Sequence, residues 1–220
     1  MLNPAYLAGK CLIFCLETII SAAHCCQGFE DKPQFVRAFI GEHNKRVFDR
    51  GQFEVQGRQI IVHPEFQRRT LIHDICVVKV EFMNLRNRET AAPACLPAVG
   101  SHPTHGTRCW AAGWGRKTNR QIASVLQEVD LNIISDEVCD TTANKGHLIK
   151  DSMFCAGYLS GGKDGCQGDS GGPLICEQDG QPMLTGVTSW GFGCGSVNSP
   201  GVWTKVESYT EWIRTLMRKS

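Results

Sequence analysis

The chain has 220 residues, of which 42% are hydrophobic and 20% charged, and its formal net charge at pH 7 is +1. This length and apolar content suffice to bury a core and to form one globular unit, of one lobe or of two similar lobes. The near-zero charge and the lack of a basic stripe argue against a nucleic-acid partner, and no apolar run is long enough to predict a membrane span.

Twelve cysteines are far more than an ordinary cytosolic enzyme carries. None of them stands in a C-x-x-C pair or in a spacing typical of a zinc site, so we expect no metal there. The composition therefore predicts an oxidised, disulfide-bonded protein that is secreted and extracellular.

The first 23 residues admit two interpretations. One is a signal peptide, with Ser21-Ala-Ala23 as a small-residue cleavage site. Glu17 interrupts its apolar stretch, however, and cleavage there would leave His24 as the terminal residue. We therefore favour the other interpretation, a truncated or divergent start of a folded domain.

Strand patterns dominate the rest of the chain. Val129, Leu131 and Ile133 alternate with polar residues, which is the period of a half-buried strand. Asp179-Gly180 favours a hairpin turn between two apolar segments. The further predicted strands are residues 60–62, 75–80, 173–177 and 183–190.

One helix is predicted, at the C-terminus. Tyr209, Trp212, Ile213 and Leu216 recur at helical spacing, and Ser208 with Glu211 fits a capping box. Many short strands, turn clusters and one closing helix predict an all-β barrel architecture. The Pro, Gly and His-rich stretch 96–107 is the candidate linker between two lobes.

The most informative motif is the run from Asp164 to Leu174, Asp-Gly-Cys-Gln-Gly-Asp-Ser-Gly-Gly-Pro-Leu. Glycines on both sides of Ser170 let the backbone turn tightly and point its N–H groups into one small space. The amides of Gly168 and Ser170 are then placed to hold a developing oxyanion.

A serine nucleophile needs a base, because its hydroxyl is unreactive at neutral pH. Ser21-Ala-Ala-His-Cys25 supplies an imidazole in His24, and an apolar strand headed by Asp74 supplies a carboxylate. The order His24, Asp74, Ser170 along the chain is the chymotrypsin order rather than that of subtilisin or the α/β-hydrolases.

On these motifs the chain resembles a trypsin-like serine endopeptidase of the chymotrypsin clan, from about Thr18 to the C-terminus. The resemblance implies two six-stranded antiparallel β-barrels, the first of them incomplete, and a C-terminal helix. Residues 1–98 would form the first half, with His24 and Asp74, and residues 99–220 the second, with Ser170. It also implies that His24 is the general base and that Asp74 fixes its tautomer.

The resemblance assigns the primary specificity pocket as well. Asp164 would be its floor and pair with a basic side chain, while Gly191 and Gly201 would keep it open. Ser189, Trp190 and Gly191 would pair with an extended substrate, and Trp190 would form an apolar wall.

Asp169 has a separate role in the family, where the α-ammonium group released by zymogen cleavage pairs with it and orders the oxyanion hole. The sequence contains no Ile-Val-Gly-Gly segment of the kind that begins the mature family domain. We therefore expect the Asp169 carboxylate to lack its usual charge partner.

Family similarity further implies four disulfides. These are Cys109–Cys176, Cys139–Cys155, Cys166–Cys194, and Cys25 with either Cys11 or Cys15. Cys76 is interpreted as a buried thiol that acts as a small hydrophobic residue, and Cys26 has no assigned partner. Cys95 lies where many relatives bridge to a propeptide or heavy chain.

Glu42 and Asp49 resemble part of the calcium loop of trypsins, but Gly51-Gln52-Phe53 lacks an expected acid. Hard cations need several oxygen ligands, so we expect no calcium and no other cofactor.

The sequence thus predicts a secreted endopeptidase that is made as a zymogen and cleaves after arginine or lysine. Its expected partners are peptide substrates and protease inhibitors. The alternative is a non-catalytic homologue that uses the barrel surface to bind a partner.

Overall fold

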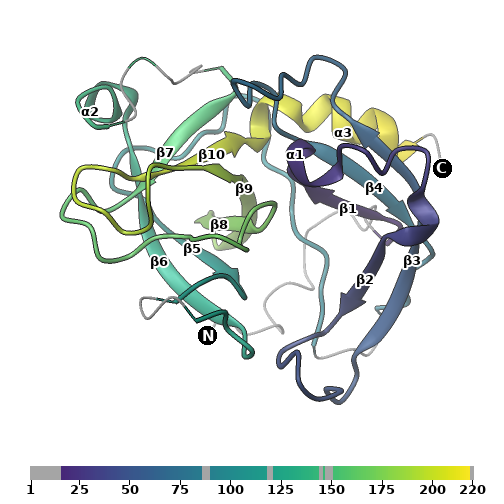
Figure 1. The fold of residues 1–220 in the computed structure, drawn as a ribbon. Coiled ribbons are helices and arrows are strands. Elements are labelled where there is room, and N and C mark those ends of the chain that lie inside the picture. Colours follow the sequence, from purple (N-terminus) through teal and green to yellow (C-terminus); the bar gives the residue numbers. More distant parts are fainter. Residues whose placement is uncertain (1–15, 86–89, 118–120, 144–145, 147–150, 219–220) are drawn as a thin grey trace.

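The computed structural model describes residues 16–85, 90–117, 121–143, 146 and 151–218. Its strands form two antiparallel sheets that lie side by side (Figure 1). The first sheet has four strands in the order β1-β4-β3-β2, and the second is a closed barrel in the order β10-β7-β6-β5-β8-β9. The first sheet comprises β1 (Thr18–Ser21), β2 (Arg37–Ile40), β3 (Phe53–Val62) and β4 (Cys76–Val80). The barrel comprises β5 (Arg108–Gly113), β6 (Gln127–Ile134), β7 (Met153–Gly157), β8 (Pro173–Gln178), β9 (Gln181–Trp190) and β10 (Gly201–Lys205).

This architecture confirms the predicted fold class, including an incomplete first barrel, which here is a curled half-barrel. The hairpin prediction is also confirmed, because β8 pairs with β9 and the turn residues Asp179 and Gly180 have φ values of 51° and 72°. Two successive positive φ angles match the right-handed twist of the flanking strands.

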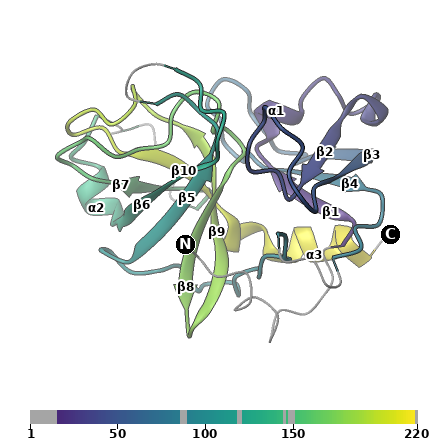
Figure 2. The same ribbon diagram turned by 90° about the horizontal axis from the view of Figure 1, so that it is seen from below.

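The helices in the described residues are short. They are α1 (Ala23–Cys26), η2 (Pro33–Phe35), α2 (Asp136–Cys139), η3 (Val206–Tyr209) and α3 (Thr210–Arg218). The α3 helix confirms the predicted C-terminal helix and lies against the first sheet (Figure 2). The predicted capping box is wrong, because Ser208 lies inside η3 and its hydroxyl donates to the Asp151 carbonyl at 2.6 Å.

The start of the described chain is part of the fold. β1 pairs with β4 from Thr18 opposite Lys79 to Ser21 opposite Cys76, and Ala22 and Ala23 are fully buried. Residues 18–23 are therefore structural, which removes the signal-peptide interpretation of this segment.

A buried cluster joins the two halves. Ile75 from the first sheet and Val187 from the barrel pack with Val206, Tyr209 and Ile213 of the C-terminal segment. The barrel has its own core, in which Leu131, Phe154, Leu174 and Trp203 are almost completely buried. The joining cluster matters for function because Ile75 directly follows Asp74.

Four disulfides join described residues: Cys26–Cys76, Cys109–Cys176, Cys139–Cys155 and Cys166–Cys194. The last three are the pairs implied by the family resemblance. The expectations for Cys25 and Cys76 are wrong. Within α1 it is Cys26 that faces β4, with a Cα–Cα distance of 6.5 Å to Cys76, while Cys25 is an exposed free thiol. Cys11 and Cys15 lie outside the described residues, and Cys95 is disulfide-bonded.

Replacement of Ile75 by alanine should lower the free energy of unfolding by about 2–5 kcal/mol, because it leaves a cavity where the two halves meet. Ile75 is fully buried, so little relaxation is available. Ile75→Val, the matched control, should cost only about 0.5–1.5 kcal/mol. Denaturant unfolding of both variants measures this difference, and equal losses would contradict the cavity explanation.

Candidate functional site

His24 and Asp74 are held together by two hydrogen bonds. His24 lies in α1, just after β1, and Asp74 lies two residues before β4. The His24 Nδ1 atom is 2.7 Å from Asp74 Oδ2, and the His24 backbone N–H donates to Asp74 Oδ1 at 2.8 Å. Because β1 and β4 are paired neighbours, residues at their ends are placed side by side.

The barrel also holds Asp74, which is only 1% exposed. The Ser189 hydroxyl donates to Asp74 Oδ2 at 2.6 Å, and the Thr204 hydroxyl donates to the Asp74 carbonyl oxygen at 2.8 Å. The sequence motifs predicted a substrate-pairing role for Ser189 and no role for Thr204. No local pattern signals these contacts, since they join residues more than 100 positions apart.

These contacts define the electrostatics of His24. The hydrogen bond that the His24 ring donates to the Asp74 carboxylate raises the pKa of His24 well above its ordinary value, and the neighbouring Cys25 adds to the rise. Burial opposes the shift. The Asp74 carboxylate therefore stabilises the protonated form of the half-buried His24 ring, the imidazolium.

Ser170 reaches the same region from the barrel side. It is exposed, and the following residue, Gly171, has a φ of 79°. A side chain on Gly171 would collide with the Ser21 hydroxyl and lie 3.3 Å from the Ala22 nitrogen. Glycine thus lets the Ser170 turn pack against the segment that leads into His24. In the described part of the chain, no hydrogen bond joins the Ser170 hydroxyl to the His24 ring.

The backbone at Gly168 is also left-handed, with a φ of 99°. A Cβ atom there would lie 3.2 Å from the Gly115 Cα atom, so the turn is packed closely against the end of β5. The Cys166–Cys194 disulfide fixes the same turn from the other side.

The Asp169 carboxylate has two backbone N–H partners. It accepts a hydrogen bond from the Gly115 N–H at 2.8 Å and another from the Cys166 N–H at 2.9 Å. Side chains on Gly113 or Gly115 would occupy the space of this carboxylate, so both glycines are required for its position.

A recess of about 250 Å³ contains both Ser170 and Asp164. Its lining includes the predicted pocket residues Ser189, Trp190, Gly191 and Gly201. A Cβ atom on Gly201 would lie 2.9 Å from Asp164 Oδ1, so glycine keeps access to the carboxylate open. Asp164 Oδ2 accepts the Gly195 N–H at 3.0 Å, and burial raises the pKa of Asp164.

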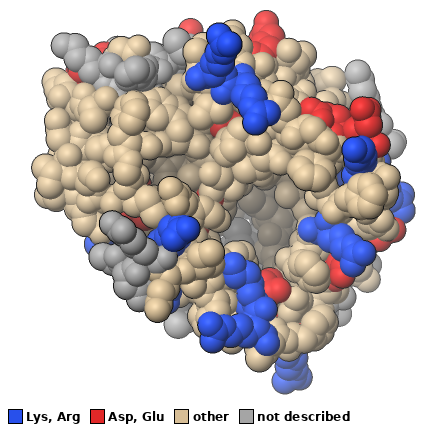
Figure 3. Space-filling model, in the orientation of Figure 1, with Lys and Arg blue, Asp and Glu red and all other residues tan. Residues whose placement is uncertain are grey.

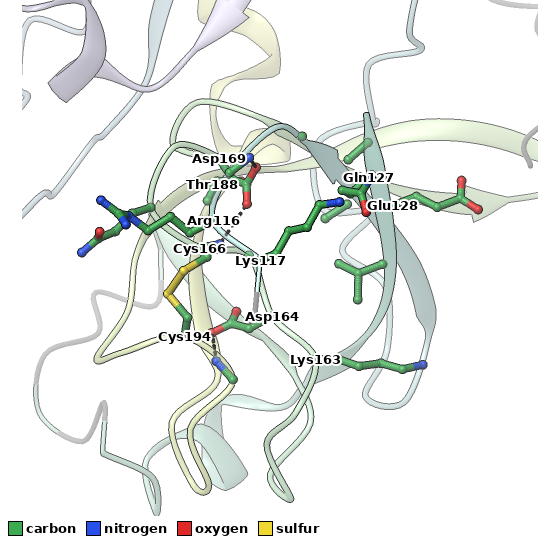
Figure 4. A pocket seen from close by; sticks show the side chains of 18 of the residues that line it. Arg116, Lys117, Gln127, Glu128, Lys163, Asp164, Cys166, Asp169, Thr188 and Cys194 are labelled. Atoms are coloured by element: carbon green, nitrogen blue, oxygen red, sulfur yellow. Dashed lines mark hydrogen bonds between the residues drawn. A yellow bond between two sulfur atoms is a disulfide. The ribbon is translucent and has the colours of Figure 1, made fainter. Parts of the chain in front are cut away.

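A larger cavity of about 860 Å³ adjoins this recess and contains both Asp164 and Asp169 (Figure 4). The Cys166–Cys194 disulfide lies between the two acids in the close-up view. On the whole molecule, the surface is hollowed between the two halves (Figure 3).

The loop that resembles a calcium site has its carboxylates occupied by protein donors. Glu42 Oε2 accepts the Gln52 side-chain amide at 2.7 Å. Asp49 Oδ2 accepts the backbone N–H groups of His43 and Asn44, both at 2.7 Å, and these bonds lower its pKa.

Comparison with known proteins agrees with this geometry. The trypsin family model matches residues 7–213. The chain belongs to the trypsin family.

Among individual relatives, human serine protease 1 is 37% identical over 203 residues, which cover 90% of this chain and 75% of the relative. Bovine coagulation factor XI is 37% identical over 200 residues, and rat transmembrane protease serine 7 is 36% identical over 203 residues. Each match covers 90% of this chain but only 31% and 24% of the respective relative. This family member therefore spans less than a third of the length of these two relatives.

None of the helices in the described residues is long and apolar enough to cross a membrane.

The source of the raised His24 pKa can be tested residue by residue. Cys25→Ser should lower the pKa of His24 while leaving it above 6.5, because the Asp74 hydrogen bond remains. Asp74→Asn should lower the pKa of His24 further than Cys25→Ser does, because the hydrogen bond with Asp74 is the largest cause of the raised pKa. NMR titration of the His24 ring measures both. An unchanged pKa in Cys25→Ser would show that the thiol contributes nothing.

Proposed function

We propose that this trypsin-family chain is a serine endopeptidase that hydrolyses peptide bonds after arginine or lysine through an acyl-enzyme. The observation that carries the proposal is the buried Asp74 bonded to His24 Nδ1, with Ser170 and Asp164 lining one recess across from them. This arrangement supports a nucleophile, a base with a fixed tautomer, and a binding site for a cationic side chain.

In the first half of the reaction, Ser170 Oγ attacks the carbonyl carbon while His24 Nε2 takes its proton. Asp74 stabilises the imidazolium through Nδ1, and the N–H groups of Gly168 and Ser170 hold the oxyanion. His24 then gives its proton to the leaving amine. In the second half, His24 takes a proton from the water molecule that attacks the acyl carbon. His24 then returns this proton to Ser170 Oγ as the C–Oγ bond breaks and the carboxyl product leaves.

Substrate selection follows from the charge in the recess. Burial makes the ionised Asp164 carboxylate costly without a cation, so a guanidinium or ammonium group that pairs with it gains affinity. Gly165, the next residue after Asp164, has no side chain and so supplies no hydroxyl group to a lysine ammonium. We expect arginine to be preferred over lysine, because its planar fork reaches the carboxylate directly.

The remaining parts of the proposal concern the setting. Four disulfides between described residues fit secretion into an oxidising compartment, where protease inhibitors would be encountered. Activation from a zymogen would bring an α-ammonium group to Asp169. Cys95 is already disulfide-bonded within this chain, so the expectation that it joins a separate propeptide or heavy chain is not carried into the proposal.

A non-catalytic binding protein is the second candidate, favoured by the missing hydrogen bond between Ser170 and His24. Titration with a serine-reactive arginyl phosphonate separates the two, because only an assembled nucleophile is labelled stoichiometrically. Catalytic hydrogen bonds are often long before substrate binds, so this geometry does not outweigh the pairing of His24 with the buried Asp74 carboxylate.

Ser170→Ala should reduce kcat for an arginyl peptide by about 10⁴-fold or more, because the nucleophile is removed. The fold and the binding of an arginine-like ligand should be nearly unchanged, since Ser170 is exposed. A variant that keeps a tenth of the wild-type rate would contradict the assignment of Ser170 as the nucleophile.

Asp164→Ser should lower kcat/KM for arginyl substrates by a factor corresponding to several kcal/mol, because a desolvated guanidinium loses its counter-charge. The same variant should lose far less activity toward a substrate with an apolar side chain. A substrate-library profile of the wild-type chain gives the matched reference. Preference for aromatic residues, or for lysine clearly ahead of arginine, would contradict the pocket assignment.

A further inference from the structure

A second cluster of reactive side chains lies in the connection between β3 and β4, away from the recess of Asp164. The two strand ends remain paired beyond their ladder, because the His63 N–H donates to the Ile75 carbonyl at 3.1 Å. Further along the connection, the Gln67 N–H donates to the Ile72 carbonyl at 3.0 Å. This hairpin places His63 and His73 face to face, with ring centroids 5.0 Å apart.

Glu65 completes the cluster. Its Oε2 atom is 3.8 Å from His73 Nε2, and one ligand atom from each of His63, Glu65 and His73 lies within 4.8 Å of the others. Zinc ligands at about 2.0–2.2 Å from the ion stand closer together than this. The side chain of Glu65 is 73% exposed, so it is free to move inward by the required distance.

The surroundings orient the two rings. His73 Nδ1 is 2.9 Å from the Tyr209 hydroxyl, which leaves Nε2 directed toward Glu65. A metal-bound histidine usually has its second nitrogen held by a hydrogen-bond partner in this way. The His63 ring packs edge-on against Trp212 of α3, at 4.9 Å between centroids.

His63 also makes one competing contact. The Glu65 N–H donates to His63 Nδ1 at 3.3 Å. Ligation through Nε2 would sacrifice only this long hydrogen bond, because the displaced ring proton moves to Nδ1.

We propose that His63, Glu65 and His73 form a binding site for Zn²⁺ or a similar divalent transition metal. Two imidazoles and one carboxylate suit Zn²⁺ or Co²⁺ and do not suit Ca²⁺, which requires more oxygen ligands. Three protein ligands leave a coordination position open to water. The ion would link the β3–β4 connection to the C-terminal segment, because the two histidines contact Tyr209 and Trp212. One of its ligands, His73, directly precedes Asp74 in the chain.

This site does not depend on the proposed peptidase activity, and its test needs no substrate. The metal-stripped full chain is studied in a Cys25→Ser background, which removes the exposed free thiol as a competing ligand. Zn²⁺ alone is titrated against a chelating dye, and Co²⁺ alone is titrated by its visible absorption and by quenching of tryptophan fluorescence. We expect saturation at one equivalent and a rise in the unfolding temperature with Zn²⁺, because the ion binds only the folded arrangement.

Two ligand variants and one control decide the outcome. His63→Gln and Glu65→Gln should each weaken Zn²⁺ binding by at least about tenfold, whereas His43→Gln, which changes an exposed histidine outside the cluster, should leave it unchanged. Glu65 is exposed, so its variant stays informative even if His63→Gln folds poorly. Full affinity in Glu65→Gln, equal losses in all three variants, or no saturable binding at millimolar Zn²⁺ would overturn the proposal.

Discussion

The Asp74 carboxylate is the contact on which the rest of the site depends. It receives hydrogen bonds from His24 in the first half and from Ser189 in the barrel, and its backbone carbonyl receives one from Thr204. A carboxylate that is 1% exposed must have such donors, because burying an unpaired charge costs several kcal/mol. The same bonds that satisfy Asp74 therefore fix how the two halves sit against each other.

This single requirement explains the packing around it. Ile75 follows Asp74 into the cluster that joins the two halves, so the position of the acid is defined by apolar contacts as well as by polar ones. Gly171 then lets the Ser170 turn approach Ser21 at the end of β1. Ser170 lies in the loop before β8 of the barrel and His24 lies in α1 beside the first sheet, yet both are positioned by contacts with the segment from β1 to α1. Substitutions at this junction should consequently affect stability and chemistry together.

Local patterns in the sequence predicted most of the fold. A continuous apolar run indicated β4, the alternation of Val129, Leu131 and Ile133 indicated β6, and the Asp179-Gly180 pair indicated the β8–β9 hairpin. The glycine-rich run around Ser170 predicted the candidate nucleophile, which stays a prediction. What local patterns could not predict are contacts set by tertiary packing. The hydrogen bond from Ser189 to Asp74 and the choice of Cys26 over Cys25 depend on which face of a strand or helix meets a distant element. Ser208 failed as a cap because η3 extends past it and offers its hydroxyl the Asp151 carbonyl instead.

The two acids of the large cavity are coupled through the same turn. Asp169 has two backbone N–H donors, and Asp164 is destabilised as an anion chiefly by burial and to a lesser degree by the charge of Asp169. The Cys166–Cys194 disulfide links the segment between the acids to the loop whose Gly195 N–H holds Asp164. On the proposed function, a cation bound at Asp164 would offset the cost of burying that carboxylate as an anion. Because Ser170 follows Asp169 directly, the two hydrogen bonds that hold the Asp169 carboxylate also restrict the backbone at Ser170.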